Sequence, residues 1–144
     1  MALRSGYKGI KKVGPGLSYS NVTGELDLNG DIGGGSFDLI FGSETITHPA
    51  VSTSPIELTA DYTQYDALLF VAGFTGSNAA SYMTSVIPVE AITQSTGTGD
   101  NDKCAFILVY SSQYIRIAKG ADNTHLVFSA ISGVGIYQVF GIKY

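Results

Sequence analysis

The chain has 144 residues, which is enough for one domain and a small appendage. Charged residues make up only 14% of it, well below the roughly 25% of an average soluble domain. The net charge of −4 and the lack of a long apolar run argue against nucleic-acid binding and membrane insertion. Because so few charges are available to solvate the surface, we expect part of it to be buried between subunits.

The basic residues gather at the start of the chain. Four of the eight Lys and Arg residues lie within residues 1–12, and no acidic residue precedes Glu25. A segment this polar cannot fold alone, so we interpret it as an N-terminal anchor that contacts an acidic protein surface; a solvated leader is the alternative. The residues expected to make this contact are Arg4, Tyr7, Lys8, Lys11 and Lys12.

Two short alternating segments follow, each preceded by a glycine-containing turn. The first covers residues 17–20, after the turn at 14–16, and the second covers residues 25–28, after the turn at 21–24. These patterns predict two brief strands. Strands this short cannot bury a core alone, so residues 13–35 are expected to need copies from neighbouring chains, as repeat proteins do. Contacts between copies are expected from Val13, Leu17, Tyr19, Leu26 and Leu28, and a hinge is expected at Gly33, Gly34 and Gly35.

Residues 13–19 read Val-Gly-Pro-Gly-Leu-Ser-Tyr, and residues 24–28 read Gly-Glu-Leu-Asp-Leu. Together they resemble the shaft repeat of trimeric viral fibres, in which a Gly-x-Gly-Leu turn leads into one strand and a second Gly turn leads into a Leu-x-Leu strand. Residues 135–144 resemble the last strand of many phage fibre head domains, which close on an aromatic-Gly-Ile-Lys ending. The resemblance implies a homotrimeric head fibre, tail fibre or spike subunit at the virion surface, held by its N-terminus on a capsid or tail protein of the same particle. A single shaft-like unit favours a short fibre.

The remaining residues, 36–144, predict an all-β head domain, either an antiparallel β-sandwich or a jelly roll. Runs of β-branched and aromatic residues with turn signals between them indicate about eight strands and no convincing helix. The predicted strands cover residues 37–41, 55–59, 65–72, 82–89, 104–110, 113–118, 125–131 and 136–142. Pro88 predicts an edge strand or a strand end. The side chains expected to be buried, in the core or between subunits, are Leu68, Phe70, Phe106, Leu108, Ile115, Ile117, Val127, Val139 and Ile142.

The longest polar connections cover residues 73–80 and 93–103. Loops of this kind are where a rigid β scaffold usually carries binding residues. Contact with a bacterial surface glycan or protein is expected from Phe74, Asn78, Tyr82, Asp100 and Asn101. Tyrosine suits such contacts because its ring stacks and its hydroxyl forms hydrogen bonds, although most tyrosines are expected in the core or in a trimer interface.

Residues that carry out catalysis are scarce. The chain has two histidines, His48 and His125, one cysteine, Cys104, and no Gly-x-Ser-x-Gly motif. Most acidic residues fall in predicted turns, so a carboxylate pair facing a cleft is not expected. We therefore predict no catalytic residue and no cofactor. The single cysteine and the lack of an apolar signal-peptide core lead us to expect synthesis in the cytoplasm of a bacterial host.

One spacing matches that of a calcium-binding loop. Asp27, Asn29, Asp31 and Asp38 occupy positions that supply ligands in such a loop, but Ile32 stands where the sharp turn requires glycine. Ordinary Asx turns explain the same residues. We therefore predict no metal site, and calcium binding stays open as the alternative.

The sequence favours a non-enzymatic, trimeric fibre or spike subunit with an adhesive or decorating head. Two alternatives from other classes stay open. A free-standing carbohydrate-binding module would be a monomer whose stability depends on sugar. A tail-spike glycan hydrolase would carry a pair of carboxylates in a cleft.

Overall fold

The computed structural model of this chain describes residues 17–19, 26–28, 35–76, 81–110 and 113–144. They belong to two compact units, Met1–Ser36 together with Tyr144, and Phe37–Lys143. Several residues with a predicted role lie outside the described residues, namely Arg4, Tyr7, Lys8, Lys11, Lys12, Val13, Gly33, Gly34 and Asn78.

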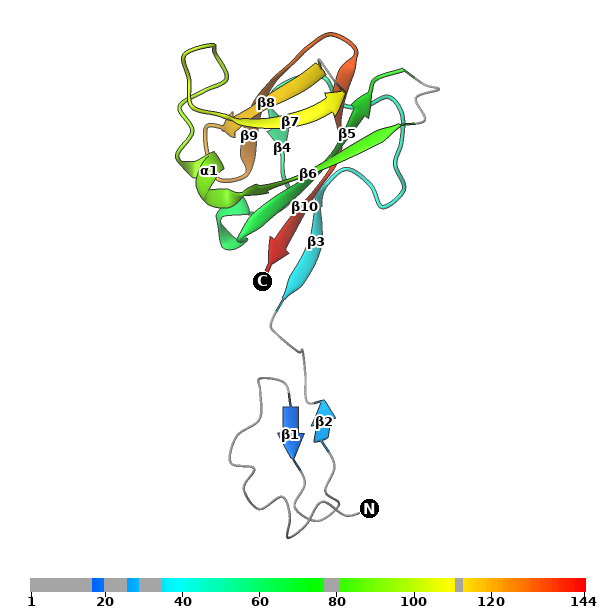
Figure 1. The fold of residues 1–144 in the computed structure, drawn as a ribbon, viewed down its shortest axis with the longest axis vertical. Coiled ribbons are helices and arrows are strands. Elements are labelled where there is room, and N and C mark those ends of the chain that lie inside the picture. Colours follow the sequence, from blue (N-terminus) through cyan, green and yellow to red (C-terminus); the bar gives the residue numbers. More distant parts are fainter. Residues whose placement is uncertain (1–16, 20–25, 29–34, 77–80, 111–112) are drawn as a thin grey trace. The chain divides into compact units, whose positions relative to one another are not determined.

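In the first unit, the described residues form a two-stranded antiparallel sheet. β1 (Leu17–Tyr19) pairs with β2 (Leu26–Leu28) (Figure 1). In this pairing Leu17 stands opposite Leu28. Both strands lie within the segments that alternation predicts. Each is three residues long, which is too short to bury a core without further partners.

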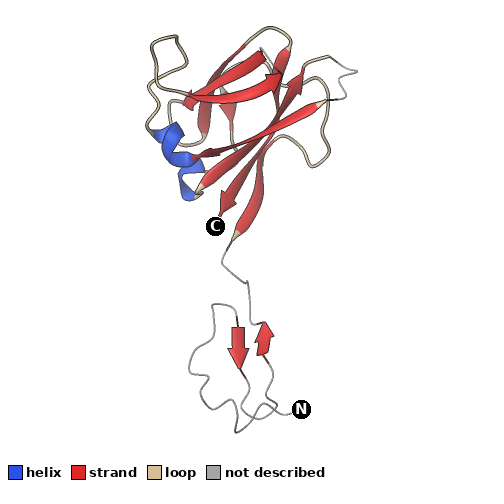
Figure 2. Cartoon of the chain, in the orientation of Figure 1, coloured by secondary structure: helices blue, strands red, loops and turns tan. Residues whose placement is uncertain are grey.

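The second unit is a sandwich of two four-stranded antiparallel sheets (Figures 1 and 2). In order across the first sheet lie β3 (Ser36–Phe41), β10 (Val134–Lys143), β5 (Ala67–Phe74) and β6 (Tyr82–Pro88). In order across the second sheet lie β4 (Ile56–Glu57), β9 (His125–Ala130), β8 (Gln113–Lys119) and β7 (Ala105–Tyr110). One turn of 3-10 helix (Tyr62–Gln64) precedes β5, and the short helix α1 (Val89–Thr93) follows β6. The prediction of an antiparallel β-sandwich is confirmed.

The core lies between the two sheets and is filled by alternate side chains of the strands. In β5, Leu68 and Phe70 are fully buried. They belong to one cluster with Ile115 and Ile117 of β8 and Val139 of β10. The prediction that these five side chains are buried is confirmed.

The outer face of β5 is covered as well. Val71 packs with Ala50 and Tyr137 in a second, smaller cluster. Ala50 belongs to the connection between β3 and β4, which is fastened to β10 by two backbone hydrogen bonds of 2.9 Å between Val51 and Ile136. Because both of its faces are covered, β5 reads in the sequence as a continuous apolar run.

β7 buries a different set of side chains from the one expected. Phe106 and Leu108 do not lie in the core, since they are 53% and 60% exposed, whereas Ile107 and Val109 are buried. Their burial between subunits, the other option given for them, stays a prediction. Successive side chains of a strand point to opposite faces, and the pairing of Ile107 with Ile115 of β8 fixes which set points inward. Val127 and Ile142, also expected to be buried, are half-buried.

Phe70→Ala should lower the free energy of unfolding by about 3–5 kcal/mol, because it removes a fully buried ring and leaves a cavity. Phe37→Ala makes the same change at a ring that is 58% exposed and stacks on Phe140 with 4.6 Å between the ring centroids. That variant should cost no more than about 1.5 kcal/mol. Denaturant unfolding at one protein concentration measures both losses. Equal losses would contradict the placement of Phe70 in the core.

Candidate interaction surface

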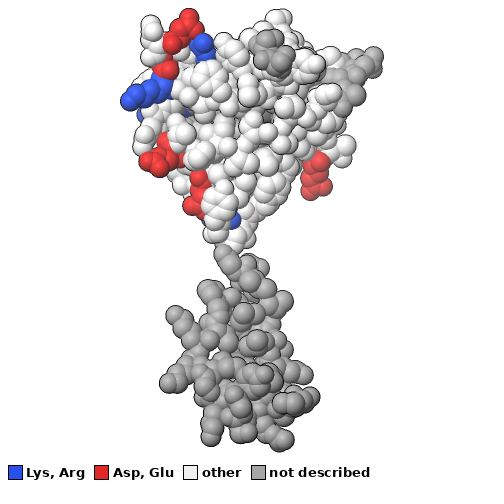
Figure 3. All heavy atoms as spheres, in the orientation of Figure 1, with Lys and Arg blue, Asp and Glu red and all other residues white. Residues whose placement is uncertain are grey.

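One edge of the sandwich carries a cluster of exposed apolar side chains. β6 and β7 belong to different sheets but lie side by side at this edge (Figure 1), and neither strand contains Lys, Arg, Asp or Glu. Figure 3 shows uncharged atoms over this edge and charged side chains around its margins. An exposed apolar patch of this kind is a candidate interaction site. We define the β6–β7 surface by Tyr82, Met83, Val86, Phe106, Leu108 and Tyr110, whose exposed fractions run from 41% to 63%.

The opposite edge of the sandwich, formed by β3 and β4, is built differently. β3 carries the exposed Asp38, and β4 is only two residues long, contains Glu57 and follows Pro55. Charged side chains, short strands and proline are the usual means by which edge strands avoid pairing with other chains. β7 has six residues and none of these features, and β6 has proline only at its last residue, Pro88, as predicted. Of the two edges, the β6–β7 edge is therefore the more open to another molecule.

Arg116 of β8 bounds the β6–β7 surface on one side. Its Nη1 donates hydrogen bonds to Oδ1 of Asp100, at 2.7 Å, and to the carbonyl oxygen of Thr98, at 3.2 Å. Its guanidinium carbon lies 5.9 Å from the centre of the Phe106 ring and 5.6 Å from that of the Tyr114 ring, within the range of cation–π contacts. The hydrogen bond to Asp100 raises the pKa of Arg116 above its usual value. Arg116 therefore stays charged and holds the loop before β7 against β8.

The same loop is braced from within by Asp102. Its carboxylate accepts hydrogen bonds from the backbone N–H of Gly99, at 2.8 Å, and from Oγ1 of Thr96, at 3.2 Å. Asp100 and Asn101, two of the predicted contacts, are exposed in this braced loop.

Aromatic side chains border the other end of β7. The ring centroid of Tyr110 lies 6.2 Å from that of Phe74. The Tyr82 hydroxyl is 3.2 Å from Nε2 of His48, and the Tyr137 hydroxyl is 3.0 Å from Nδ1 of the same ring. Tyr137 also donates a hydrogen bond to the carbonyl oxygen of Phe74, and burial raises the pKa of Tyr137. His48 thus ties the β3–β4 connection to both β6 and β10.

The predicted receptor contacts therefore fall into two groups. Phe74 and Tyr82 lie near the end of β7, and Asp100 and Asn101 lie in the loop before its start. A strand of six residues spans roughly 17 Å, so the two groups border one strand without forming one compact site.

Sequence reasoning did not decide whether Phe106 and Leu108 lie in the core or on a surface shared between subunits, and it gave Arg116 no role. Apolar side chains occupy both alternating sets of β7, so the pattern alone does not say which set faces outward. The charge of Arg116 indicates the outward face of β8, between the buried Ile115 and Ile117. The pairing of β7 with β8 shifts register between Leu108 and Tyr110, so from the sequence alone this signal does not carry over to β7. Phe106 is paired with Arg116 across the β7–β8 hairpin and shares its face.

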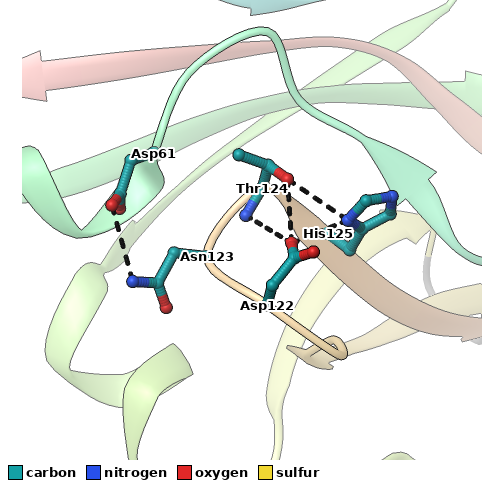
Figure 4. A network of polar contacts seen from close by, with 5 residues as sticks. All are labelled: Asp61, Asp122, Asn123, Thr124 and His125. Carbon is teal, nitrogen blue, oxygen red and sulfur yellow. Dashed lines mark hydrogen bonds and ion pairs between the residues drawn. The ribbon is translucent and has the colours of Figure 1, made fainter.

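A second polar cluster lies at the connection between β8 and β9. Oδ1 of Asp122 accepts hydrogen bonds from the backbone N–H of Thr124, at 2.9 Å, and from Nδ1 of His125, at 2.7 Å (Figure 4). The hydrogen bond with His125 lowers the pKa of Asp122 to about 2 and raises the pKa of His125. Nearby, the side-chain amide of Asn123 lies 3.5 Å from a carboxylate oxygen of Asp61. These contacts order a turn, which is the role expected of most acidic residues here.

Among the described residues, no group of three or more His, Cys, Asp or Glu side chains is placed to hold a metal ion. Of the calcium-like set, Asp27 is paired with Ser18 between β1 and β2, and Asn29 and Asp31 lie outside the described residues. Within the described part of the chain, no helix is long and apolar enough to cross a membrane.

Comparison of the chain with protein-family models, curated proteins and solved structures finds no match. The resemblance to viral fibres therefore rests on residues 13–28 and 135–144 of the sequence itself. The fold and the β6–β7 surface supply the remaining support for a function.

Asp122→Asn should return the pKa of His125 toward its ordinary value, because the variant removes the carboxylate that accepts a hydrogen bond from Nδ1 of His125. The wild-type chain should exceed the variant in stability most clearly between about pH 4 and pH 6.5. The Asp122 contribution is lost as the pH falls from 3.8 toward about 2. The His125 contribution is complete below its ordinary pKa and is lost as the pH rises through its raised pKa. NMR titration of His125 and unfolding at several pH values measure these effects.

Asn123→Ala is the matched control, since Asn123 contacts Asp61 in the same turn. The pKa of His125 should stay raised in that variant. An equal fall in both variants would assign the shift to the shape of the turn and not to the Asp122 carboxylate.

Proposed function

We propose that the chain is a non-enzymatic structural subunit of a phage particle. It forms a homotrimeric short fibre or spike, its N-terminal segment binds a capsid or tail protein, and its β head stands at the virion surface for adhesion or decoration. The observation that carries the proposal is the uncharged β6–β7 surface, which is exposed in the single chain and suited to contact with protein.

The two motif segments fold in a way that agrees with this proposal. β1 and β2 are short paired strands of the kind that a shaft would complete with neighbouring copies. Most of the segment that resembles the closing strand of fibre heads lies in β10, between β3 and β5 in the first sheet.

The contacts of the two histidines support structural roles for them. His48 has both ring nitrogens within hydrogen-bond distance of tyrosine hydroxyls. His125 is held by Asp122 in a turn. Both rings therefore already have partners that explain their positions.

Carbohydrate binding is the second candidate. Tyr110 is 63% exposed, and the ion pair of Arg116 with Asp100 lies toward the other end of β7. Exposed aromatic rings suit sugar stacking when polar groups stand nearby. A module of this kind would be a monomer, so the oligomeric state separates the two candidates.

The purified protein should have the mass of three chains of 15.1 kDa, or about 45 kDa, in light scattering at micromolar concentration. Its melting temperature should rise with protein concentration, because mass action favours an assembled native state. A mass of one chain would contradict the proposal, and a melting temperature raised by sugar in that monomer would favour the carbohydrate-binding module.

Deleting residues 1–12 should leave the trimer assembled but abolish its attachment to particles, because this segment carries half of the basic side chains and cannot fold alone. Attachment of the intact protein should weaken as salt rises, since exposed charges are screened over about 8–10 Å near physiological ionic strength. Occupancy on purified particles measures both effects.

Replacement of the four N-terminal basic residues by Gln tests charge separately from the backbone and should also reduce occupancy. Lys103→Gln, at an exposed lysine of the head, is the control and should leave occupancy unchanged. Normal occupancy of the shortened protein would place the anchor in another part of the chain.

A further inference from the structure

We infer that the β6–β7 surface is covered by a second copy of this chain, with the edge formed by β6 and β7 turned toward the threefold axis of the assembly. This inference rests on the proposed homotrimer and adds which surface the copies share. Four properties of the edge lead to it: its need for a permanent cover, its size, its chemistry and its two flanks.

An apolar edge without charged residues needs a permanent cover. β7 presents six residues with no charge and no proline, and such an edge pairs with other chains when it is left open. The molecule that covers this edge must therefore be present wherever the folded chain is present. A second copy meets this condition from synthesis onward, whereas a receptor on another cell does not.

The size of the surface fits a contact between subunits. Its six side chains expose 41–63% of their area, or roughly 600 Å² in all if large side chains offer about 150–250 Å² each. A standard interface buries roughly 800 Å² on each partner, with an apolar centre and a polar rim. Divided between two neighbours, the β6–β7 surface supplies part of the apolar centre of each interface, and the ion pair of Arg116 with Asp100 stands at its margin.

The chemistry of the surface selects an apolar occupant. β6 and β7 contain no Lys, Arg, Asp or Glu, so a charged partner would lose hydration without gaining an opposite charge. A neutral glycan needs several hydrogen-bonding groups, but Val86, Phe106 and Leu108 offer none. Among the six side chains of this surface, hydroxyls come only from Tyr110 and from Tyr82, whose hydroxyl already lies 3.2 Å from Nε2 of His48. The same surface of another copy carries no charge that would lose hydration, and it does not depend on many hydrogen-bonding groups.

The edge also has the two flanks that a closed trimer requires. Each chain of a cyclic trimer meets its two neighbours through two different patches. Val86 is paired with Leu69, which packs on the outer face of the first sheet. Phe106 and Leu108 lie on the outer face of the second sheet, because they alternate with the buried Ile107. An edge turned toward the axis therefore offers one apolar flank to each neighbour.

The test is the reactivity of single thiols in the full-length protein. In a Cys104→Ser background, Leu108→Cys places a thiol in the β6–β7 surface, and Glu57→Cys places one on the opposite edge; both positions are exposed in the single chain. A maleimide should modify the Leu108→Cys protein at least about tenfold more slowly, because thiols react according to their access. In denaturant the two rates should become equal. Val86→Cys, on the other flank, should be protected as Leu108→Cys is.

Light scattering on the same samples separates this inference from the proposed function. Slow labelling of Leu108→Cys at the mass of three chains supports both. Fast labelling of Leu108→Cys at the mass of three chains overturns the inference about the shared surface but agrees with the proposed trimer. Fast labelling at the mass of one chain overturns both, and slow labelling in a dimer keeps the second copy as the occupant but rejects the threefold axis.

Discussion

Alternation of side chains across a pleated strand is the constraint on which the rest of this structure depends. Successive residues point to opposite faces, and two sheets packed about 10 Å apart bury only one of the two sets. In β5 the second set is covered by the β3–β4 connection, where Ala50 packs with Val71. In β7 the second set includes Phe106 and Leu108 and stays exposed within the described chain. The same periodicity thus gives one strand two buried faces and another an open apolar face.

The charged groups that the structure describes act largely in turns and loops. Arg116 and Asp100 fasten the loop before β7 to β8, and Asp122 with His125 orders the connection between β8 and β9. Charge-assisted hydrogen bonds of this kind are stronger than neutral ones, so a few of them suffice to order a loop. Only 14% of the residues are charged. Several of these charged residues lie in the connections between strands, and none lies in β6 or β7. The low charge content of the chain therefore shows in its structure as an edge without charged side chains.

The sandwich could be predicted because individual strands have recognisable sequence patterns. Examples are the unbroken apolar run of β5 and the proline, Pro88, at the end of β6. The outward face of β7 could not be predicted, because Phe106 and Ile107 are both apolar and a shift of one residue exchanges the two faces. Only the pairing of Ile107 with Ile115 settles the register. Four of the predicted contacts lie at the two ends of β7, but the sequence did not show that they border one strand, because they come from segments far apart in the chain.

In the proposed trimer, the open apolar edge couples the stability of each chain to its association with the others. Removing apolar surface from water contributes roughly 25 cal/mol per Å², and association costs about 4–15 kcal/mol in lost motion. In the proposed trimer each chain buries roughly 600 Å² of apolar surface, divided between two neighbours, and this burial works against that cost. Contacts between different patches either close into a ring or continue as a filament. An assembly of defined size therefore requires a closed ring. In the proposed trimer, β1 and β2 need neighbouring strands around a common axis, and the β6–β7 edge needs a cover on both flanks. The same two neighbours satisfy both needs, and a closed ring leaves no apolar edge for a further copy.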